Sequence, residues 1–317
     1  MYKLTWHIKI GGYRLQTLKS LVINSSVLNL SDTAVIELPC KHMNQWRKVE
    51  GEIHAGDDVC IQLGYDNALE TEFNGYLKSI KRENNSLVLE CIDALYLMDN
   101  TLSDMEYKSV GLKLLLQDIL AQIDPEMRVD CDYDFTYEKM VVFKSTALDV
   151  LKKIHEDTKA NIYFEGKTLH VHPVYQQLSG DKACVFDTRK NIQSTNLKWV
   201  DKNDKKVQVE VKYIKPDGKI DKKEYGVNGG QKVTRYVQSS NEGDLKRATE
   251  NEYNLWNYSG YEGDFTGWLI PRVQAGGSVR LTDKDRDETG IYYVTGVEIE
   301  FGQSGAKRKV SLGRKLS

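Results

Sequence analysis

Proline and cysteine are both scarce in this sequence, and no long apolar run interrupts it. The 317 residues include 5 prolines and 5 cysteines, and the cysteines are Cys40, Cys60, Cys91, Cys131 and Cys184. Their number is odd and no CxxC spacing occurs, which predicts reduced, mostly buried thiols rather than a disulfide framework. No stretch approaches the roughly 18 apolar residues that span a bilayer, so no membrane segment is predicted.

A strong net charge and a secretion signal are also missing. The formal net charge is −2, which leaves no electrostatic basis for binding DNA or RNA along a basic face. Residues 1–10 alternate polar and apolar side chains and contain no continuous apolar core and no small-residue cleavage site. We therefore expect a protein that is made in the cytoplasm and carries no signal peptide.

Glycine and tyrosine, in contrast, are abundant, with 24 and 18 residues, and this balance favours strands joined by glycine turns. One pattern occurs twice: a glycine-led strand, a loop, a longer strand, a turn and a third strand. The segments are 56–63, 72–81 and 86–93 near the N-terminus, and 276–281, 291–300 and 307–312 near the C-terminus. Two copies of one β-unit predict a quasi-symmetric protein, not one organised around a single catalytic cleft.

The chain divides by pattern into three parts. Residues 1–101 read as short strands at turn-punctuated spacing, which is typical of a small barrel or sandwich. Residues 102–175 alternate helical and strand patterns, and residues 176–317 return to β with one predicted helix at 244–256. The predicted fold class is α+β and mostly β, with two similar small, tube-like β-barrel domains flanking an α+β module.

Within the middle part, a leucine-rich stripe predicts a helix over 109–123, which Asp124-Pro125 ends. A strand is expected at 139–143. Thr146 and Asp149 have the spacing of a capping box, which predicts the start of a second helix. Residues 161–172 then read as a hairpin. The predicted order is helix, strand, helix, hairpin.

Two acidic segments have carboxylates at the spacing of a calcium loop. In 130–134 the required glycine at the sixth position is Phe135 and the glutamate at the twelfth is Val141, so the pattern fails. Segment 283–287 fails in the same way and is interpreted as a solvated hairpin loop.

Other candidates for chemistry are weak. His170 and His172 project from one face of a strand, but a zinc site needs further ligands and none is nearby in sequence. His155 has no accompanying cysteine or serine motif, and no GxSxG, HExxH, P-loop or GxGxxG pattern occurs. Nothing distinguishes one carboxylate pair among 46 acids. We predict no catalytic residue, no cofactor-binding residue and no metal ligand.

An aromatic run is the remaining feature, and it consists of Trp256, Tyr258, Tyr261, Phe265 and Trp268. A sugar- or peptide-binding loop is one interpretation. A core or subunit-interface segment is the favoured one, because aromatic side chains are enriched at interfaces and supply large buried areas.

Three segments carry a resemblance to a known family: 56–93, 143–171 and 271–312. Together they resemble the baseplate hub proteins of contractile phage tails and related injection systems. These are the late control D and Mu-type hub proteins, which are similar to the hub part of type VI secretion spike proteins. The resemblance covers most of the chain in the order of the family.

The resemblance implies a structural protein without catalysis or cofactor. Such hubs are homotrimers in which two similar barrels per subunit build a ring of pseudo-sixfold symmetry between tail tube and spike. Implied partners are the tail tube protein, the spike protein and baseplate wedge proteins, and DNA or an effector passes through the channel without specific binding. The protein is then made in the bacterial cytoplasm and assembled into a virion baseplate or injection particle.

The sequence ends at Ser317 without a spike β-helix or a lysozyme-like segment, so the spike is expected to be a separate polypeptide. Two alternatives stay open. One is a tail-associated cell-wall hydrolase, which requires an acidic pair in a groove. The other is a carbohydrate-binding module that uses the aromatic run.

Overall fold

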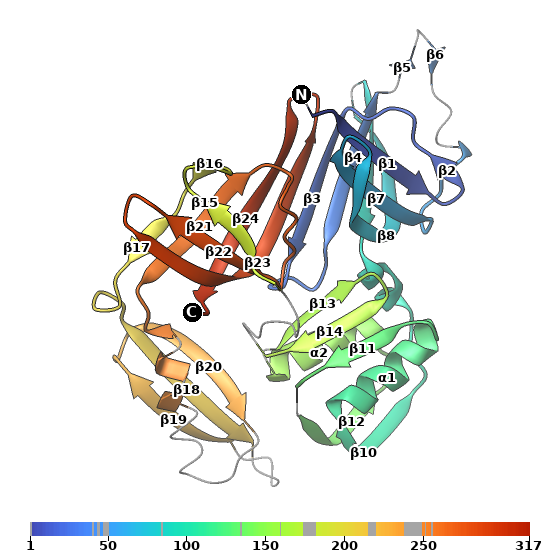
Figure 1. Cartoon of the computed structure of the whole chain (residues 1–317). Helices are drawn as coiled ribbons and strands as arrows, with labels where there is room; N and C mark the ends of the chain where they lie inside the picture. Colours follow the sequence, from blue (N-terminus) through green and yellow to red (C-terminus); the bar gives the residue numbers. More distant parts are fainter. Residues whose placement is uncertain are drawn as a thin grey trace.

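The computed structural model describes residues 2–39, 41–42, 45–46, 51–83, 85–133, 135–158, 160–173, 182–214, 220–237, 249–250, 252–254 and 256–317. Strands dominate, and they form a large, mostly antiparallel sheet beside smaller ones (Figure 1). The mostly β, α+β fold class is confirmed. No helix in these ranges is both long enough and apolar enough to cross a membrane.

The first β unit is formed by residues 4–92, drawn in blue in Figure 1. Its sheet order is β3-β4-β9-β8-β7-β1-β2. The strands are β1 (Leu4–Ile10), β2 (Tyr13–Arg14), β3 (Ser20–Ser26), β4 (Thr33–Pro39), β7 (Asp58–Tyr65), β8 (Ala68–Glu83) and β9 (Ser86–Ile92), and β5 (Lys41–His42) and β6 (Gln45–Trp46) form a separate short ladder. The three strands of the first predicted repeat are β7, β8 and β9.

The second β unit repeats this strand order as β16-β21-β24-β23-β22-β15, except that β15 is parallel to β22 whereas β1 is antiparallel to β7. Its strands are β15 (Cys184–Asp187), β16 (Ile192–Thr195), β17 (Lys198–Val200), β21 (Gly260–Gly267), β22 (Ser278–Asp283), β23 (Glu288–Gly302) and β24 (Gly305–Lys315). The antiparallel meanders β7-β8-β9 and β22-β23-β24 correspond, so the duplication predicted from the sequence is present. Both long middle strands contain β-bulges, which let one strand bend and change partner along its length.

The two units share one sheet. Strand β3 pairs antiparallel with the second half of β23, from Gly296↔Ser26 to Gly302↔Ser20. The sheet therefore runs from one unit into the other, and a single cluster of buried apolar side chains serves both. Ile23 of β3 is 1% exposed in that shared core, opposite Ile299 of β23.

The α+β module, drawn in green, lies below the first unit in Figure 1 and has a core of its own. Its elements are η2 (Ala94–Asp99), β10 (Met105–Gly111), α1 (Leu112–Ile123), β11 (Arg128–Cys131), β12 (Thr136–Val142), α2 (Ala147–Thr158), β13 (Asn161–Glu165) and β14 (Thr168–His172). Helix α1 begins three residues later than predicted, because Val110 and Gly111 pair with β12. The predicted hairpin is β13–β14, and β11 joins it in the order β11-β14-β13.

The capping box at the start of α2 is confirmed. The Asp149 N–H donates to Thr146 Oγ1 at 3.2 Å, and the Thr146 N–H donates back to Asp149 Oδ2 at 3.0 Å. These reciprocal bonds satisfy two backbone donors that have no partner within the helix.

A three-stranded sheet not predicted as a unit extends from the second β unit. It is formed by β18 (Val207–Ile214), β19 (Ile220–Gly226) and β20 (Gln231–Val237) in the order β19-β18-β20. Val207, Val209 and Val211 are buried, as the alternation predicted, and the side chain of Tyr213 lies outside the described part. Residues 249–250, 252–254 and 256 of the predicted helix are helical; the rest of 244–256 lies outside the described residues.

The four described cysteines are free of disulfides, and Cys91 and Cys131 are buried. Burial raises the pKa of the Cys91 thiol to about 12, so it stays protonated and unreactive at neutral pH. Cys40 lies outside the described residues.

We expect Ile23→Ala to destabilise both β units together, by about 2–5 kcal/mol, because a large buried side chain is removed from a shared core. Hydrogen exchange measured by mass spectrometry should show peptides from β7–β9 and from β22–β24 losing protection in parallel. Val22→Ala, at the adjacent half-buried position of the same strand, is the matched control and should cost less. Loss of protection in the first unit alone would contradict a common core.

Candidate functional site

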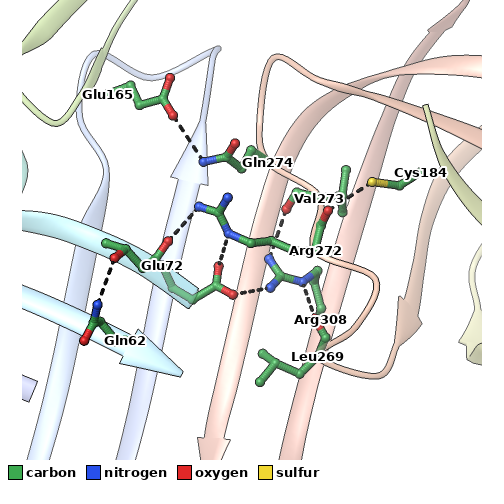
Figure 2. Close-up of polar contacts among 10 residues, drawn as sticks. Gln62, Glu72, Glu165, Cys184, Leu269, Arg272, Val273, Gln274 and Arg308 are labelled. Carbon is green, nitrogen blue, oxygen red and sulfur yellow. Dashed lines mark hydrogen bonds and ion pairs between the residues drawn. The ribbon is translucent and has the colours of Figure 1, made fainter. Parts of the chain in front are cut away.

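The two β units and the α+β module meet around a cavity of about 290 Å³. Its walls come from β8, from the β13–β14 hairpin, and from the segment between β21 and β22, with Arg308 of β24 beneath. Polar and charged side chains from all three parts gather here (Figure 2). This junction is therefore the candidate functional site.

A buried ion pair crosses from one β unit to the other. Arg308 lies on the inward face of β24, between buried Ala306 and Val310, so the strand alternation places a guanidinium in the core. Its Nη2 donates to Glu72 Oε1 of β8 at 2.6 Å, and the side chains are 1% and 4% exposed. A buried charge is tolerated only when it is paired, so this contact fixes the two units relative to one another.

The other donors of Arg308 are also used. Nε donates to the Leu269 carbonyl at 3.1 Å and Nη1 to the Val273 carbonyl at 3.0 Å. Both carbonyls belong to the segment that follows β21, so one guanidinium organises this segment and holds it against β8. Figure 2 shows the three contacts converging.

Arg272, which lies between β21 and β22, also contacts β8 and Glu72. Its Nη2 donates to the Thr71 carbonyl of β8 at 2.6 Å, and its Nε lies 3.6 Å from Glu72 Oε2. Gln274 Nε2 donates to Glu165 Oε1 of the α+β module at 3.3 Å. Both oxygens of Glu72 thus face arginines, an arrangement that locks geometry and leaves no free carboxylate for proton transfer.

Two aspartates, the buried Asp93 and the half-buried Asp32, lie at the entry to the α+β module. The Asp32 N–H donates to Asp93 Oδ2 at 2.9 Å, and the Ser26 N–H donates to Asp32 Oδ1 at 2.9 Å. Burial raises the pKa of the Asp32 carboxyl to about 6 and that of Asp93 to about 7, although the backbone hydrogen bonds oppose the shift.

The sequence alone did not distinguish this pair from the other acidic residues. Carboxyl groups with shifted pKa values beside a cavity are a general signal of active sites. Here the oxygens act as caps. Asp93 Oδ1 accepts the Leu95 N–H at the start of η2, at 3.0 Å, while Oδ2 and Asp32 Oδ1 accept backbone donors as well. The geometry therefore supports a structural joint better than the hydrolase alternative.

The two histidines of β14 have a neighbour that sequence spacing did not indicate. Asp130 of β11 lies directly opposite His170 in a parallel pair, and its carboxylate approaches both imidazoles. Asp132 follows at the end of the strand, and Asp134 lies outside the described residues. His155 is elsewhere, with its Nδ1 2.9 Å from the Ala160 carbonyl.

The second acidic segment is only partly the solvated loop that was predicted. Residues 284–287 connect β22 and β23, and Arg189 pairs with Asp285. Asp283, however, is buried and accepts a hydrogen bond from the Tyr261 hydroxyl, which lowers the pKa of Asp283.

The aromatic run lies mainly in the core. Tyr261 and Phe265 of β21 are 7% and 0% exposed, and Tyr258 packs against the same cluster. Trp256 packs on the small valine core of the third sheet, and Trp268 is 52% exposed. The favoured core interpretation holds for four of the five.

Solved structures with the same architecture were found. The 43 kDa tail protein of prophage MuSo2 from Shewanella oneidensis matches with a TM-score of 0.66 and 12% identity over 98% of each chain. The tail protein from Neisseria meningitidis MC58 matches with a TM-score of 0.67 and 15% identity, over 99% of this chain and 97% of that one. This chain has the fold of phage tail proteins.

The fold extends to secretion machinery. The Escherichia coli c3393 protein, a component of the type VI secretion system with structural similarity to the T4 tail proteins gp27 and gp5, matches with a TM-score of 0.61 and 10% identity. This match covers 97% of this chain and 76% of that one. No protein-family model and no curated protein matches the sequence. The tail-protein fold is therefore recognised by structure.

Removing one partner of the buried ion pair should be costly. We expect Arg308→Met to destabilise the protein by about 3–5 kcal/mol in urea unfolding, since Glu72 stays buried without a partner. The double variant Glu72→Leu/Arg308→Met should recover part of this loss. Lys81→Met, which breaks the half-exposed pair with Glu90, is the control and should cost at most about 1 kcal/mol. If Arg308→Met and Lys81→Met lost the same stability, the Arg308–Glu72 pair would not have the structural role assigned to it.

The aspartate pair should give the protein a defined pH dependence. Both folded-state pKa values are raised above the ordinary value near 3.9, so the folded state binds more protons than the unfolded state between about pH 4 and 7. The contribution of the pair to stability should therefore fall as pH rises through this window. Asp93→Asn should flatten the dependence and lower stability most at pH 5, because an amide keeps one acceptor oxygen for the two backbone N–H groups that donate to Asp93.

Unfolding free energies at pH 5 and pH 8 would check this. Asp99→Asn, at an exposed acid at the end of the same short helix, should keep the wild-type slope. A wild-type slope in Asp93→Asn would refute the assignment.

Proposed function

We propose that this chain is a structural hub protein of a contractile phage tail or a related injection system. Three copies would form a ring of pseudo-sixfold symmetry that joins the tail tube to the central spike. The observation that carries the proposal is the duplicated β unit together with the β3–β23 junction, which is one of the six contacts such a ring needs. The tail-protein fold supports the same role.

The junction leaves two matching edges open, one along the second half of β8 and one along β16. Residues 78–83 of β8 pair with β9 on one side and with no described strand on the other. In the second unit the corresponding half of β23 has β3 on that side. Strand β16, the counterpart of β3, ends the sheet and also has an open edge. Pairing β8 of one copy with β16 of the next would repeat the junction between subunits.

The register of this contact follows from the repeat. Both hairpins close on two-residue turns, after the pairs Glu83↔Ser86 and Gly302↔Gly305. Counting back two residues makes Lys81 of β8 the counterpart of Glu300 of β23. Glu300 pairs with Val22 of β3. The residue that meets Lys81 is therefore the counterpart of Val22 in the second unit.

That residue is Ser194. Val22 pairs with Val35, which pairs with the residue four positions into β9. Ser194 pairs with Thr266, which pairs with the residue four positions into β24. Ser194 of one copy would thus lie opposite Lys81 of the next. Three such contacts close a ring, and obligate interfaces of this kind typically bury more than about 2,000 Å².

In this arrangement the remaining parts have defined neighbours. The ring faces would contact the tail tube protein and the spike protein, and the α+β module would contact baseplate wedge proteins. The net charge of −2 suits a channel that passes DNA or an effector without binding it. Assembly into a virion or injection particle made in a bacterial cytoplasm follows from this role, and no catalysis is required.

Mass measurement in solution is the first test. We expect about three times 36.3 kDa, with negative-stain images of a ring that has a central hole and six lobes. A monomer at high concentration would overturn the hub proposal. The same preparation should show no peptidoglycan hydrolysis and no glycan binding, the activities that the two alternatives predict.

The register predicts a specific charge test. Ser194→Lys should weaken the trimer about 3- to 160-fold, because each of three contacts gains like charges directly opposite one another, at about 0.2–1 kcal/mol each. Lys81→Ser alone should change little, and the double variant should restore the trimer. Thr136→Lys, on an exposed position of β12, is the control. Trimer dissociation on dilution measures the effect, and a double variant as weak as Ser194→Lys would contradict the register.

A further inference from the structure

Two histidines and an aspartate converge on one face of the β11-β14-β13 sheet. His170 Nδ1 lies 3.1 Å from Asp130 Oδ2, and His172 Nε2 lies 3.4 Å from each of these atoms. The parallel register places Asp130 opposite His170, and His172 follows two residues later on the same face. The three atoms form a nearly equilateral triangle.

The size of this triangle is that of a metal site. Zinc binds imidazole nitrogen and carboxylate oxygen at about 2.0–2.2 Å, so tetrahedral ligands lie about 3.3–3.6 Å apart. The observed edges of 3.1, 3.4 and 3.4 Å match one face of that tetrahedron. An ion above the triangle could reach all three atoms without a backbone change.

Hydrogen bonds alone explain the three close contacts of this cluster less completely than a bound cation does. His170 Nδ1 faces both the Asp130 carboxylate and His172 Nε2, and one ring nitrogen carries either a proton or a lone pair. A protonated Nδ1 can donate to Asp130 but cannot accept from His172. A cation, in contrast, uses lone pairs on all three atoms.

The outward-facing ring nitrogens have partners of the kind that metal sites use. His170 Nε2 lies 3.7 Å from Glu165 Oε2, and His172 Nδ1 lies 3.5 Å from Asp132 Oδ2. His172 Nδ1 is buried and makes no hydrogen bond at ordinary distance to any residue that the structure describes. With the other nitrogens on a metal, these two carry protons and face carboxylates, which orients the imidazoles and raises their basicity.

The cluster is also held rigidly while one side stays open. His170 and His172 are 7% and 3% exposed, and the Tyr163 ring stacks on His170 at 5.0 Å between centroids. The Asp130 side chain is 47% exposed. Water can therefore reach the fourth position beside Asp130.

We propose that Asp130, His170 and His172 bind one divalent transition-metal ion, best fitted by Zn²⁺, with water as the fourth ligand. Asp132 and Glu165 orient the two imidazoles. The ion joins β11 to β14, and Glu165 continues from it to Gln274 of the second β unit. The site thus stiffens the α+β module where it meets the ring-forming part of the chain.

Metal titration of untagged, EDTA-treated and dialysed protein tests this. Co²⁺ should bind at one ion per chain and give the visible absorption of four-coordinate cobalt, and Zn²⁺ should displace it. His172→Ala and Asp130→Asn should weaken Zn²⁺ binding more than about 100-fold, and Asp132→Asn about 10- to 100-fold. His54→Ala, at an exposed loop histidine, should bind like the wild type.

Folding is controlled independently of binding. Asp130→Asn changes a half-exposed side chain of unchanged size, so its circular dichroism should be that of the wild type. Zinc should raise the melting temperature of the wild type, and EDTA should reverse the rise. No binding to the wild type would overturn the proposal. Equal affinity in the wild type and in folded Asp130→Asn would show an adventitious ion only and would overturn it as well.

Discussion

The backbone ladder between β3 and β23 is the constraint on which the rest of the structure depends. It joins residues 20–26 of β3 to residues 296–302 of β23 in one sheet, so neither β unit can form its full core without the other. The long middle strands are bulged because each must pair with different neighbours along its two halves. A duplicated unit alone would give two domains joined by a flexible linker. The ladder instead fixes the position of one unit relative to the other.

The buried charges at the junction follow from that ladder. Once β24 is aligned beside β23, its alternation turns Arg308 inward, and the only way to bury a guanidinium there is to supply a carboxylate and carbonyls. Glu72 comes from the opposite unit, so the ion pair reports whether the units are correctly placed. Apolar side chains would bury surface area in many relative positions of the two units, whereas the Arg308–Glu72 ion pair forms in only one.

Sequence patterns predicted the repeat, the leucine stripe of α1 and the capping box of Thr146, because each depends on neighbours within a few residues. They could not predict partners that are distant along the chain. Arg308 and Glu72 are 236 residues apart, and Asp130 and His170 are 40 apart, so alternation could mark the histidines as facing one way without showing what they face. The start of α1 was misplaced for the same reason, since pairing with β12 outweighs helical propensity at 109–111. The single sheet through both β units was likewise invisible to local patterns.

Open sheet edges connect the fold to its proposed assembly. An unpaired edge invites pairing with any extended chain, and lysine on such an edge is a common protection against aggregation. β8 carries Lys78 and Lys81 along its open half, yet β16 presents the uncharged residues Gln193, Ser194 and Thr195. An edge protected by charge can still accept a strand that brings none, while two copies of the lysine edge repel. In the proposed assembly, this charge difference would favour the heterologous pairing of β8 with β16 over the pairing of two β8 edges, and a heterologous contact that repeats at a fixed rotation would close into a ring.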